Sequence, residues 1–377
     1  MNDSLTEKEQ RYLEQIAAGP VSLRSRVVPW ALEILPGTAF FVYGILADQV
    51  YWEVFGFLSV VYFAVWRMYG QLRGRRLLKS IYAKALVVSD DVMDASGDLH
   101  RYAAFTSDPA GGNPAGVWVG DQLPAPEEMQ RIAAEVGYSE TAFVAPASGH
   151  ARTVRYFSPE MEVPFCGHAT IATGVALAAS DGEGVFTLDT LAGEIPVTVR
   201  EQEGRVEASL VSVDPKHEAA PDALVTEVTA LLGWHSDELD PAIPAVKAFA
   251  GAWHLVLAAH SRERLASLDY DFDALKATME REGLVTLQLV WREDVAVFHS
   301  RNPFPVGGVV EDPATGAAAA ALGGYLRDAA LIEPPAAISI RQGEAMGQPS
   351  LLDVEIPERG GIVVRGTAVP IPDATRS

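Results

Sequence analysis

The sequence predicts an α/β protein of two similar halves, each a β-sheet wrapped around a central helix, preceded by an all-α transmembrane hairpin. Three observations lead to this fold class. Two long apolar runs lie near the start, short alternating apolar stretches follow from Leu99 onward, and two glycine-led, alanine-rich segments lie 149 positions apart. With 377 residues, 49% of them apolar, the chain is long enough for two or three domains with large cores.

Charge divides the chain into two parts of different character. Residues 1–92 carry 10 basic and 9 acidic residues, which leaves 19 basic and 41 acidic residues in 93–377. A net charge of −21 argues against nucleic acid as a partner, because no basic surface is available to displace phosphate counterions. A single cysteine excludes an internal disulfide framework and a multi-cysteine zinc site.

The first part contains the predicted membrane hairpin, residues 27–69. Val27–Ala47 holds only Glu33 as a charge, and Val50–Trp66 holds only Glu53. About 20 apolar residues span a bilayer core, with about 17 near the lower limit, so both runs qualify. The alternative interpretation is a buried helical hairpin or a dimerisation module.

Basic residues flank the two runs and are absent from the connector between them. The positive-inside rule then places both ends of the hairpin in the cytoplasm, so the N-terminal segment 1–26 and the catalytic domain are expected on that side of the membrane. A Gly/Asp/Ser-rich stretch ends the linker 70–97. Beyond it we expect a first half over 98–213 and a second half over 214–377.

Short alternating stretches and turn residues make the second part rich in strands. The predicted strands are Arg101–Phe105, Ala115–Val119, Thr141–Ala145, Thr153–Phe157, Val185–Asp189, Ile195–Arg200, Val206–Val211, Val246–Ala250, Trp253–Ala259, Thr286–Val290 and Val295–His299. The spacing of apolar residues predicts amphipathic helices over Pro126–Val136, Pro221–Leu232 and Asp273–Arg281.

Two helices of nearly pure Ala, Gly and Thr follow Cys166 and Thr315. Such small residues suit a helix that is closely surrounded by sheet. A helix N-terminus offers unpaired N–H groups and the positive end of its dipole, so two facing helix starts could bind a small carboxylate. Titratable residues lie at both starts: Cys166 and His168 at the first, Glu311 and Asp312 at the second. The alternative is two unrelated alanine-rich helices.

Glu140 lies at the mouth of a predicted apolar strand. Partial desolvation there would raise the pKa of its carboxyl toward that of a usable acid/base, whereas a solvated edge glutamate is the ordinary alternative.

Five motifs occur in the order and spacing of the PhzF-like phenazine-biosynthesis isomerases, which the region 98–370 resembles. They are Gly112-Asn-Pro-Ala-Gly-Val117, Ser139-Glu-Thr-Ala-Phe143, Pro164-Phe-Cys-Gly-His-Ala-Thr170, Glu311-Asp-Pro-Ala-Thr-Gly316 and Gln342-Gly-Glu-Ala-Met-Gly347. The resemblance implies a diaminopimelate-epimerase-like fold of two halves related by a pseudo-twofold axis, with the site in the cleft between them. It also implies a homodimer.

By this resemblance, the catalytic residues are Glu140 as proton shuttle, His168 and Asp312. The implied substrate-binding residues are Asn113, Gly167, Thr315, Gly316 and Ala317. The phenazine enzyme of the family has serine where this chain has Ala317, which removes one hydrogen bond to the phenazine precursor. Cys166 matches one of the paired cysteines of related epimerases, but the chain has no second cysteine. A two-thiol racemase mechanism is therefore excluded, and Cys166 is expected to be a packing residue.

The resulting hypothesis is a cofactor-independent isomerase that moves a proton at carbon on a small carboxylate-bearing metabolite, tethered to the lipid bilayer through 27–69. No metal site is expected from the histidine spacing. The alternative is a catalytically inactive small-molecule binding or regulatory module on a membrane tether. A racemase or hydrolase fits less well, because the chain has one thiol and neither a serine elbow nor a set of metal ligands.

Overall fold

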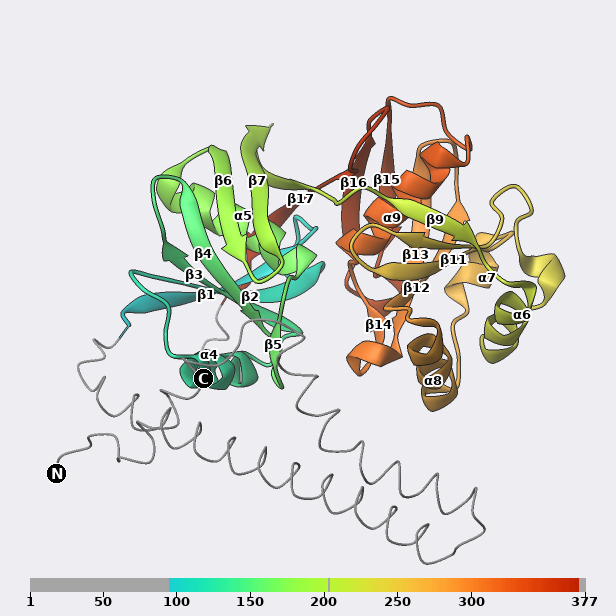
Figure 1. Ribbon diagram of the computed structural model, residues 1–377, viewed down its shortest axis with the longest axis horizontal. Coiled ribbons are helices and arrows are strands. Elements are labelled where there is room, and N and C mark those ends of the chain that lie inside the picture. Colours follow the sequence, from blue (N-terminus) through green and yellow to red (C-terminus); the bar gives the residue numbers. More distant parts are fainter. Residues whose placement is uncertain (1–94, 203, 373–377) are drawn as a thin grey trace, which may run out of the picture. The chain divides into compact units, whose positions relative to one another are not determined.

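The computed structural model describes residues 95–202 and 204–372 (Figure 1). The predicted segments 1–26 and 27–69, and most of the linker 70–97, lie outside these residues. Among the described residues, no helix has the length and apolar character needed to cross a membrane.

Eight strands of the first half close into a barrel. In spatial order they are β1 (Gly97–Ala104), β2 (Asn113–Gly120), β3 (Glu140–Pro146), β4 (Ala151–Phe157), β6 (Gly184–Thr190), β7 (Gly193–Gln202), β8 (Arg205–Val211) and β17 (Val363–Pro370). Each strand pairs with the next, and β17 pairs back to β1. The strand β17 therefore completes the first barrel although it lies in the segment expected for the second half.

The second half repeats this arrangement without closing. Its strands run β9 (Lys216–Ala219), β10 (Val246–Phe249), β11 (Trp253–Ala258), β12 (Thr286–Arg292), β13 (Val297–Phe304), β15 (Ala336–Gln342) and β16 (Ser350–Ile356). From β10 to β17 the pairings are antiparallel, parallel, antiparallel, parallel, antiparallel and antiparallel, the same succession as from β1 to β8. The two halves thus share one topology.

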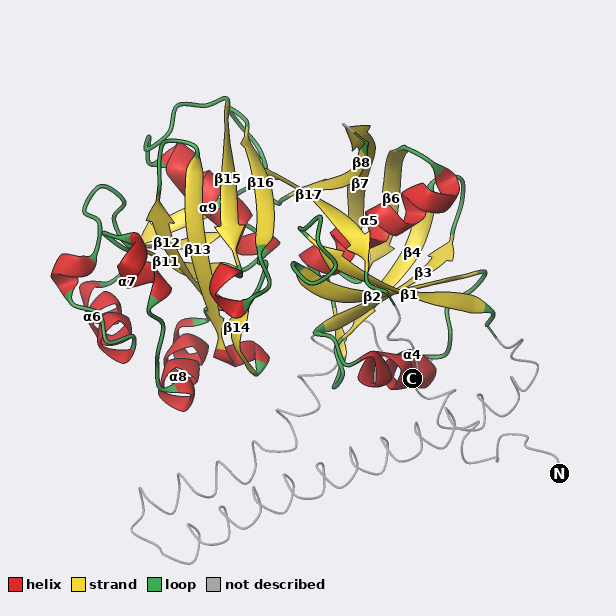
Figure 2. Ribbon diagram, turned by 180° about the vertical axis from the view of Figure 1, so that it is seen from behind, coloured by secondary structure: helices red, strands yellow, loops and turns green. Residues whose placement is uncertain are grey.

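A small-residue helix lies inside each curved sheet, as Figure 2 shows in red against yellow strands. These are α5 (Gly167–Asp181) and α9 (Gly316–Asp328), both largely buried. A Cβ added at Gly174 would lie 2.9 Å from the Ala208 Cβ, and one at Gly323 would lie 3.0 Å from a Val354 methyl. The close approach of helix and sheet explains the alanine- and glycine-rich composition, and it confirms the enclosed position expected for both helices.

Longer side chains cover the outer faces of the two sheets. In the first half, α4 (Pro126–Val136) buries Met129 and Ala133 against Trp118 and Phe143. In the second half, α6 (Asp222–Leu231), α7 (Arg262–Ala266) and α8 (Phe272–Glu282) pack with a leucine-rich cluster on β11 and β12. The short elements are β5 (Glu162–Val163), β14 (Val309–Asp312), and the 3₁₀ turns η1 (Ser236–Glu238), η2 (Pro305–Gly307) and η3 (Glu344–Met346).

Candidate active site

The fold brings residues from both halves together at the N-terminal ends of the two central helices. Glu140 is the first residue of β3 and His168 lies in the first turn of α5. Asp312 ends β14, four residues before α9 begins. Asn113, at the start of β2, joins the halves because its Nδ2 donates hydrogen bonds to Asp312 Oδ1 (2.9 Å) and to the Ala314 carbonyl (3.2 Å).

His168 is at the centre of the first-half group. Its Nε2 lies 3.5 Å from Glu140 Oε2 and 3.3 Å from Ser139 Oγ, and its Nδ1 lies 3.3 Å from Cys166 Sγ. The imidazole is buried, whereas the Glu140 side chain keeps 20% of its surface exposed. A carboxyl that is largely desolvated yet open to solvent on one side can exchange protons with a bound molecule.

Asp312 is held by the loop that leads into α9. The Thr315 hydroxyl donates a 2.5 Å hydrogen bond to Asp312 Oδ2. The buried Gln342 fastens the same loop: its Nε2 donates to the Asp312 carbonyl (2.7 Å) and to Thr315 Oγ1 (3.0 Å), and its Oε1 accepts from the Thr315 N–H (3.2 Å). Both carboxylate oxygens of Asp312 are thereby occupied and its direction is set.

Burial governs the electrostatics of this group. It raises the pKa of Asp312 to about 6, and the Glu140 charge adds to that rise. His168, Thr315 and Asn113 act in the opposite direction. Burial also raises the pKa of the Cys166 thiol well above its usual range, and Glu140 again adds to the rise. Asp312 therefore takes up a proton more readily than an ordinary aspartate, and Cys166 remains a thiol at neutral pH.

The two helix starts leave backbone donors available. No side chain within the described residues caps α5 or α9, although the Thr315 N–H ahead of α9 is taken by Gln342. The first N–H groups of an α-helix have no partner inside the helix. A Cβ added at Gly167 would meet no atom within 4 Å, so there is open space beside the start of α5. Gly316 and the partly buried Ala317 open α9.

Three side chains of this site could also hold a metal ion. One donor atom each from Glu140, Cys166 and His168 lies within 4.8 Å of the other two. The spacing of histidines in the sequence indicates no such group, because the glutamate comes from a different element 26 positions before the cysteine.

The structure thus groups Glu140, His168, Asp312, Asn113 and Thr315 through direct contacts or charge interactions, with Gly167, Gly316 and Ala317 at the helix starts. Two neighbours were not singled out from the sequence as site residues, Ser139 and Gln342. Ser139 belongs to the Ser139–Phe143 motif and Gln342 to the Gln342–Gly347 motif, so membership of these motifs could have identified both residues.

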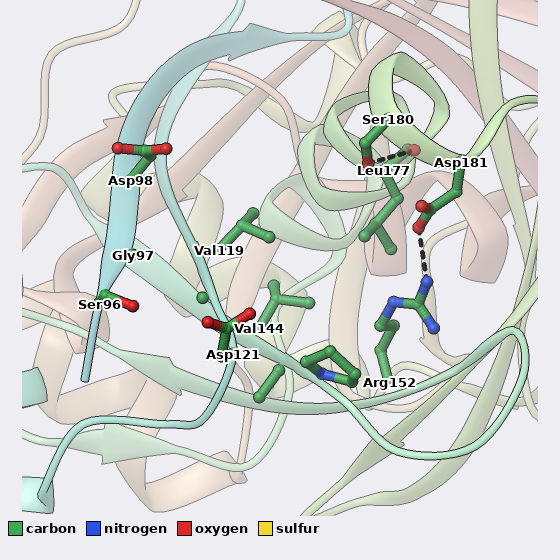
Figure 3. A pocket seen from close by; sticks show the side chains of 13 residues that line it. Ser96, Gly97, Asp98, Val119, Asp121, Val144, Arg152, Leu177, Ser180 and Asp181 are labelled. Carbon is green, nitrogen blue, oxygen red and sulfur yellow. Dashed lines mark hydrogen bonds and ion pairs between the residues drawn. The ribbon is translucent and has the colours of Figure 1, made fainter. Parts of the chain in front are cut away.

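A separate cavity lies at the far end of α5 (Figure 3). It has a volume of about 430 Å³, and Leu177, Ser180 and Asp181 of α5 line one side of it. Arg152 and Asp181 form an ion pair of 2.5 Å there. None of the predicted site residues lines this cavity, so it is distinct from the group around Glu140.

Comparisons with known proteins agree with this architecture. Residues 102–374 match the family model of phenazine biosynthesis-like proteins, PhzC-PhzF. An uncharacterized isomerase of Bacillus subtilis, YfhB, is 30% identical over 72% of this chain and 96% of its own length. The trans-2,3-dihydro-3-hydroxyanthranilate isomerase of Pseudomonas fluorescens is 34% identical over 67% of this chain and 89% of its length. A Bacillus anthracis PhzF-family crystal structure superposes with a TM-score of 0.65 at 26% identity, covering 73% of this chain and 96% of the other.

Proposed function

Because the chain belongs to the phenazine biosynthesis-like PhzC-PhzF family, we propose that it is an isomerase that needs no cofactor and moves a proton between carbon atoms of a small carboxylate-bearing metabolite. The observation that carries this proposal is the grouping of Glu140, His168 and Asp312 at two adjacent helix starts. Relatives named as isomerases support the reaction class.

In the proposed mechanism, Glu140 acts as the acid/base. Its carboxylate removes a proton from a carbon next to a conjugated or carboxyl group, and the electron pair left on carbon moves into that group. The carboxyl, whose side chain keeps 20% of its surface exposed, exchanges that proton with solvent, and it then delivers a proton to a second carbon of the shifted double bond. His168 lies 3.5 Å from Glu140 and positions it, and Asp312 positions the substrate from the other half. The backbone donors at the helix starts stabilise the charge that develops on the substrate oxygens.

Comparison of the two halves supports a single acid/base. The β2–β3 ladder begins with Ala115 opposite Glu140, and the equivalent β11–β12 ladder begins with His254 opposite Thr286. Thr286 therefore occupies in the second half the position that Glu140 occupies in the first. Its hydroxyl cannot serve as a base at neutral pH. Return of the proton by the same carboxyl suits an isomerisation better than an inversion, which needs one base on each face of the carbon.

The residue after Gly316 bears on the substrate. Ala317 has no hydroxyl, so we propose that the substrate differs from the compound named for the Pseudomonas fluorescens relative. Wild type should turn over trans-2,3-dihydro-3-hydroxyanthranilate slowly, and Ala317→Ser should raise kcat/KM for it. Rapid turnover by wild type with no gain in Ala317→Ser would refute this substrate assignment.

The reaction class is tested by solvent exchange. The full-length chain is incubated in heavy water with a panel of cyclic and amino-acid-derived unsaturated carboxylates, and deuterium in the recovered compounds is measured by mass spectrometry. Wild type should introduce deuterium at carbon and Glu140→Gln should not. Equal incorporation by both proteins would remove Glu140 from the mechanism. Tight binding without exchange by wild type would favour a binding or regulatory module instead.

We further propose that residues 27–69 tether the enzyme to the bilayer with the catalytic domain on the cytoplasmic side, and that the enzyme is a homodimer. The hydropathy of the two apolar runs and the basic residues that flank them support the tether. Tagged full-length protein should stay with membranes after a carbonate wash, and release by the wash would contradict the tether. The molar mass of the detergent-solubilised protein, measured by light scattering, should be that of a dimer. A monomeric mass would contradict the homodimer.

A further inference from the structure

We propose that Glu140, Cys166 and His168 form a binding site for a divalent cation of the Zn²⁺ class, and that the bound ion blocks isomerisation. The metal site is inferred from the geometry, donor types and charge of these residues, independently of the proposed reaction. Inhibition rests in addition on the proposed role of Glu140 as acid/base.

The separation of the Glu140 and His168 donors suits a tetrahedral ion, and Cys166 would have to move toward them. His168 Nε2 lies 3.5 Å from Glu140 Oε2 and 3.9 Å from Cys166 Sγ, and all three donors lie within 4.8 Å of one another. With metal–ligand bonds of about 2.0–2.3 Å, two ligands of a tetrahedral zinc ion lie about 3.3–3.6 Å apart. The largest adjustment falls on Cys166, whose side chain rotates about a single bond.

The donor types select the class of metal. One sulfur, one imidazole nitrogen and one carboxylate oxygen suit zinc and similar borderline-soft ions, whereas calcium and magnesium prefer oxygen donors only. Three protein ligands leave a fourth position for water. No ligand has to be recruited from another part of the protein, because Cys166 and His168 share one helix start and Glu140 already faces the imidazole.

The negative charge of the surrounding carboxyls favours a cation, although the positive end of the α5 dipole opposes it. Burial raises the pKa of Asp312 and the Glu140 charge adds to the rise, so the two carboxyls repel one another across the site. A divalent ion would relieve this repulsion. The positive end of α5 opposes the ion, but two anionic ligands and the nearby Asp312 outweigh a partial charge. On binding, Cys166 forms the metal–sulfur bond as a thiolate and its proton passes to solvent. The Ser139 contact with His168 Nε2 is replaced by the metal.

A bound metal ion would prevent catalysis because the Glu140 carboxylate would bind the ion instead of the substrate proton. The Glu140 oxygen that faces His168 would become a ligand, and the charge withdrawn by the ion would make the carboxylate too weak a base to take a proton from carbon. The ion would also stand beside the open space at Gly167, where the substrate is expected.

Cobalt spectroscopy of the full-length chain tests the site independently of turnover. Cys166 is the chain's single cysteine, so a thiolate-to-cobalt charge-transfer band can arise from this residue alone. Titration with Co²⁺ should produce the band with one equivalent bound, and Zn²⁺ should displace it. Cys166→Ser should abolish the band, and His168→Gln should weaken Co²⁺ binding at least 100-fold, since loss of even an outer partner costs about 10–100-fold.

A matched control and the activity assay separate the outcomes. His260→Gln, an exposed histidine outside the site, should keep the full band. Absence of the band in wild type, or a band that His168→Gln leaves unchanged, would overturn the metal site. Zn²⁺ should stop deuterium exchange and a chelator should restore it. Exchange that persists with one equivalent of Zn²⁺ bound would overturn inhibition. A cobalt band in a protein that exchanges no substrate would uphold the metal site while refuting the proposed isomerase.

Discussion

Replacing Gln342 with methionine tests how the Asp312 loop is held. Methionine keeps the length of the buried side chain but removes three hydrogen bonds, two donated by Nε2 and one accepted by Oε1. The Asp312 carbonyl and the Thr315 N–H lose their partners, and each unsatisfied buried group costs about 1–3 kcal/mol. Because both residues are only partly buried and water can reach them, we expect a loss of about 2–3 kcal/mol in the free energy of unfolding.

The same change should lower activity. A displacement of about 1 Å at a positioning group can reduce the rate about 100-fold, so kcat/KM should fall by about 10–100-fold as Asp312 loses its direction. Urea unfolding and steady-state kinetics measure the two effects. Gln130→Met is the matched control, because Gln130 donates one hydrogen bond, to the Ser158 carbonyl, outside the site. It should cost about 0.5–1.5 kcal/mol and leave kcat/KM unchanged. A loss below about 0.5 kcal/mol with unchanged kinetics in Gln342→Met would refute the reasoning.

Three further predictions concern stability and access to the site. Burial lowers the pKa of His254 to about 3, so between that value and about 6.5 only the unfolded chain binds its proton. The His254 contribution to the free energy of unfolding should therefore fall by about 2 kcal/mol from pH 7.5 to pH 5, whereas the raised pKa of Asp312 acts in the opposite direction over this range. In urea titrations at the two pH values, the change in the free energy of unfolding should differ by about 2 kcal/mol between wild type and His254→Gln; equal changes in the two proteins would argue against the assignment. Gly174→Ala should lower the free energy of unfolding by about 1–3 kcal/mol, because the added Cβ would lie 2.9 Å from the Ala208 Cβ. An unchanged free energy of unfolding would show that the strands of the barrel can move apart to accommodate it. Gly167→Ala should leave the free energy of unfolding unchanged, because its Cβ would meet no atom within 4 Å. The added methyl group would occupy space expected for the substrate and should lower kcat/KM about 10-fold, the usual effect of one methyl group in a binding pocket. Full activity would show that the substrate binds elsewhere.

Local patterns were sufficient to predict much of the fold. The spacing of Met129, Ile132, Ala133 and Val136 predicts the helix that the structure shows over Pro126–Val136. The alternating stretches locate the cores of the strands from β1 to β4 to within a few residues. The small side chains of α5 and α9 indicated enclosure, because only glycine and alanine permit backbones to approach so closely.

Long-range pairing could not be predicted in this way. In β17, Val364 pairs with Leu210 and Ala368 pairs with Ala104, so the last strand closes the barrel that the first strand begins. Nothing in the alternation of Val363–Pro370 specifies which barrel it joins.

The site shows the same limit. Motifs placed Glu140 and His168 among the candidates, but the hydrogen bond between Asn113 and Asp312 spans 199 positions and depends on how the halves meet. The support from Gln342 likewise arises only when β15 ends beside the start of α9.

A crystal structure with a bound unsaturated carboxylate that undergoes exchange tests the central claim most directly. The account predicts the ligand's carboxylate at the starts of α5 and α9, with the exchanging carbon about 3–3.5 Å from the Glu140 carboxyl, the distance of a near-attack geometry. A ligand seated instead in the cavity beside Arg152 and Asp181, at the opposite end of α5, would contradict it.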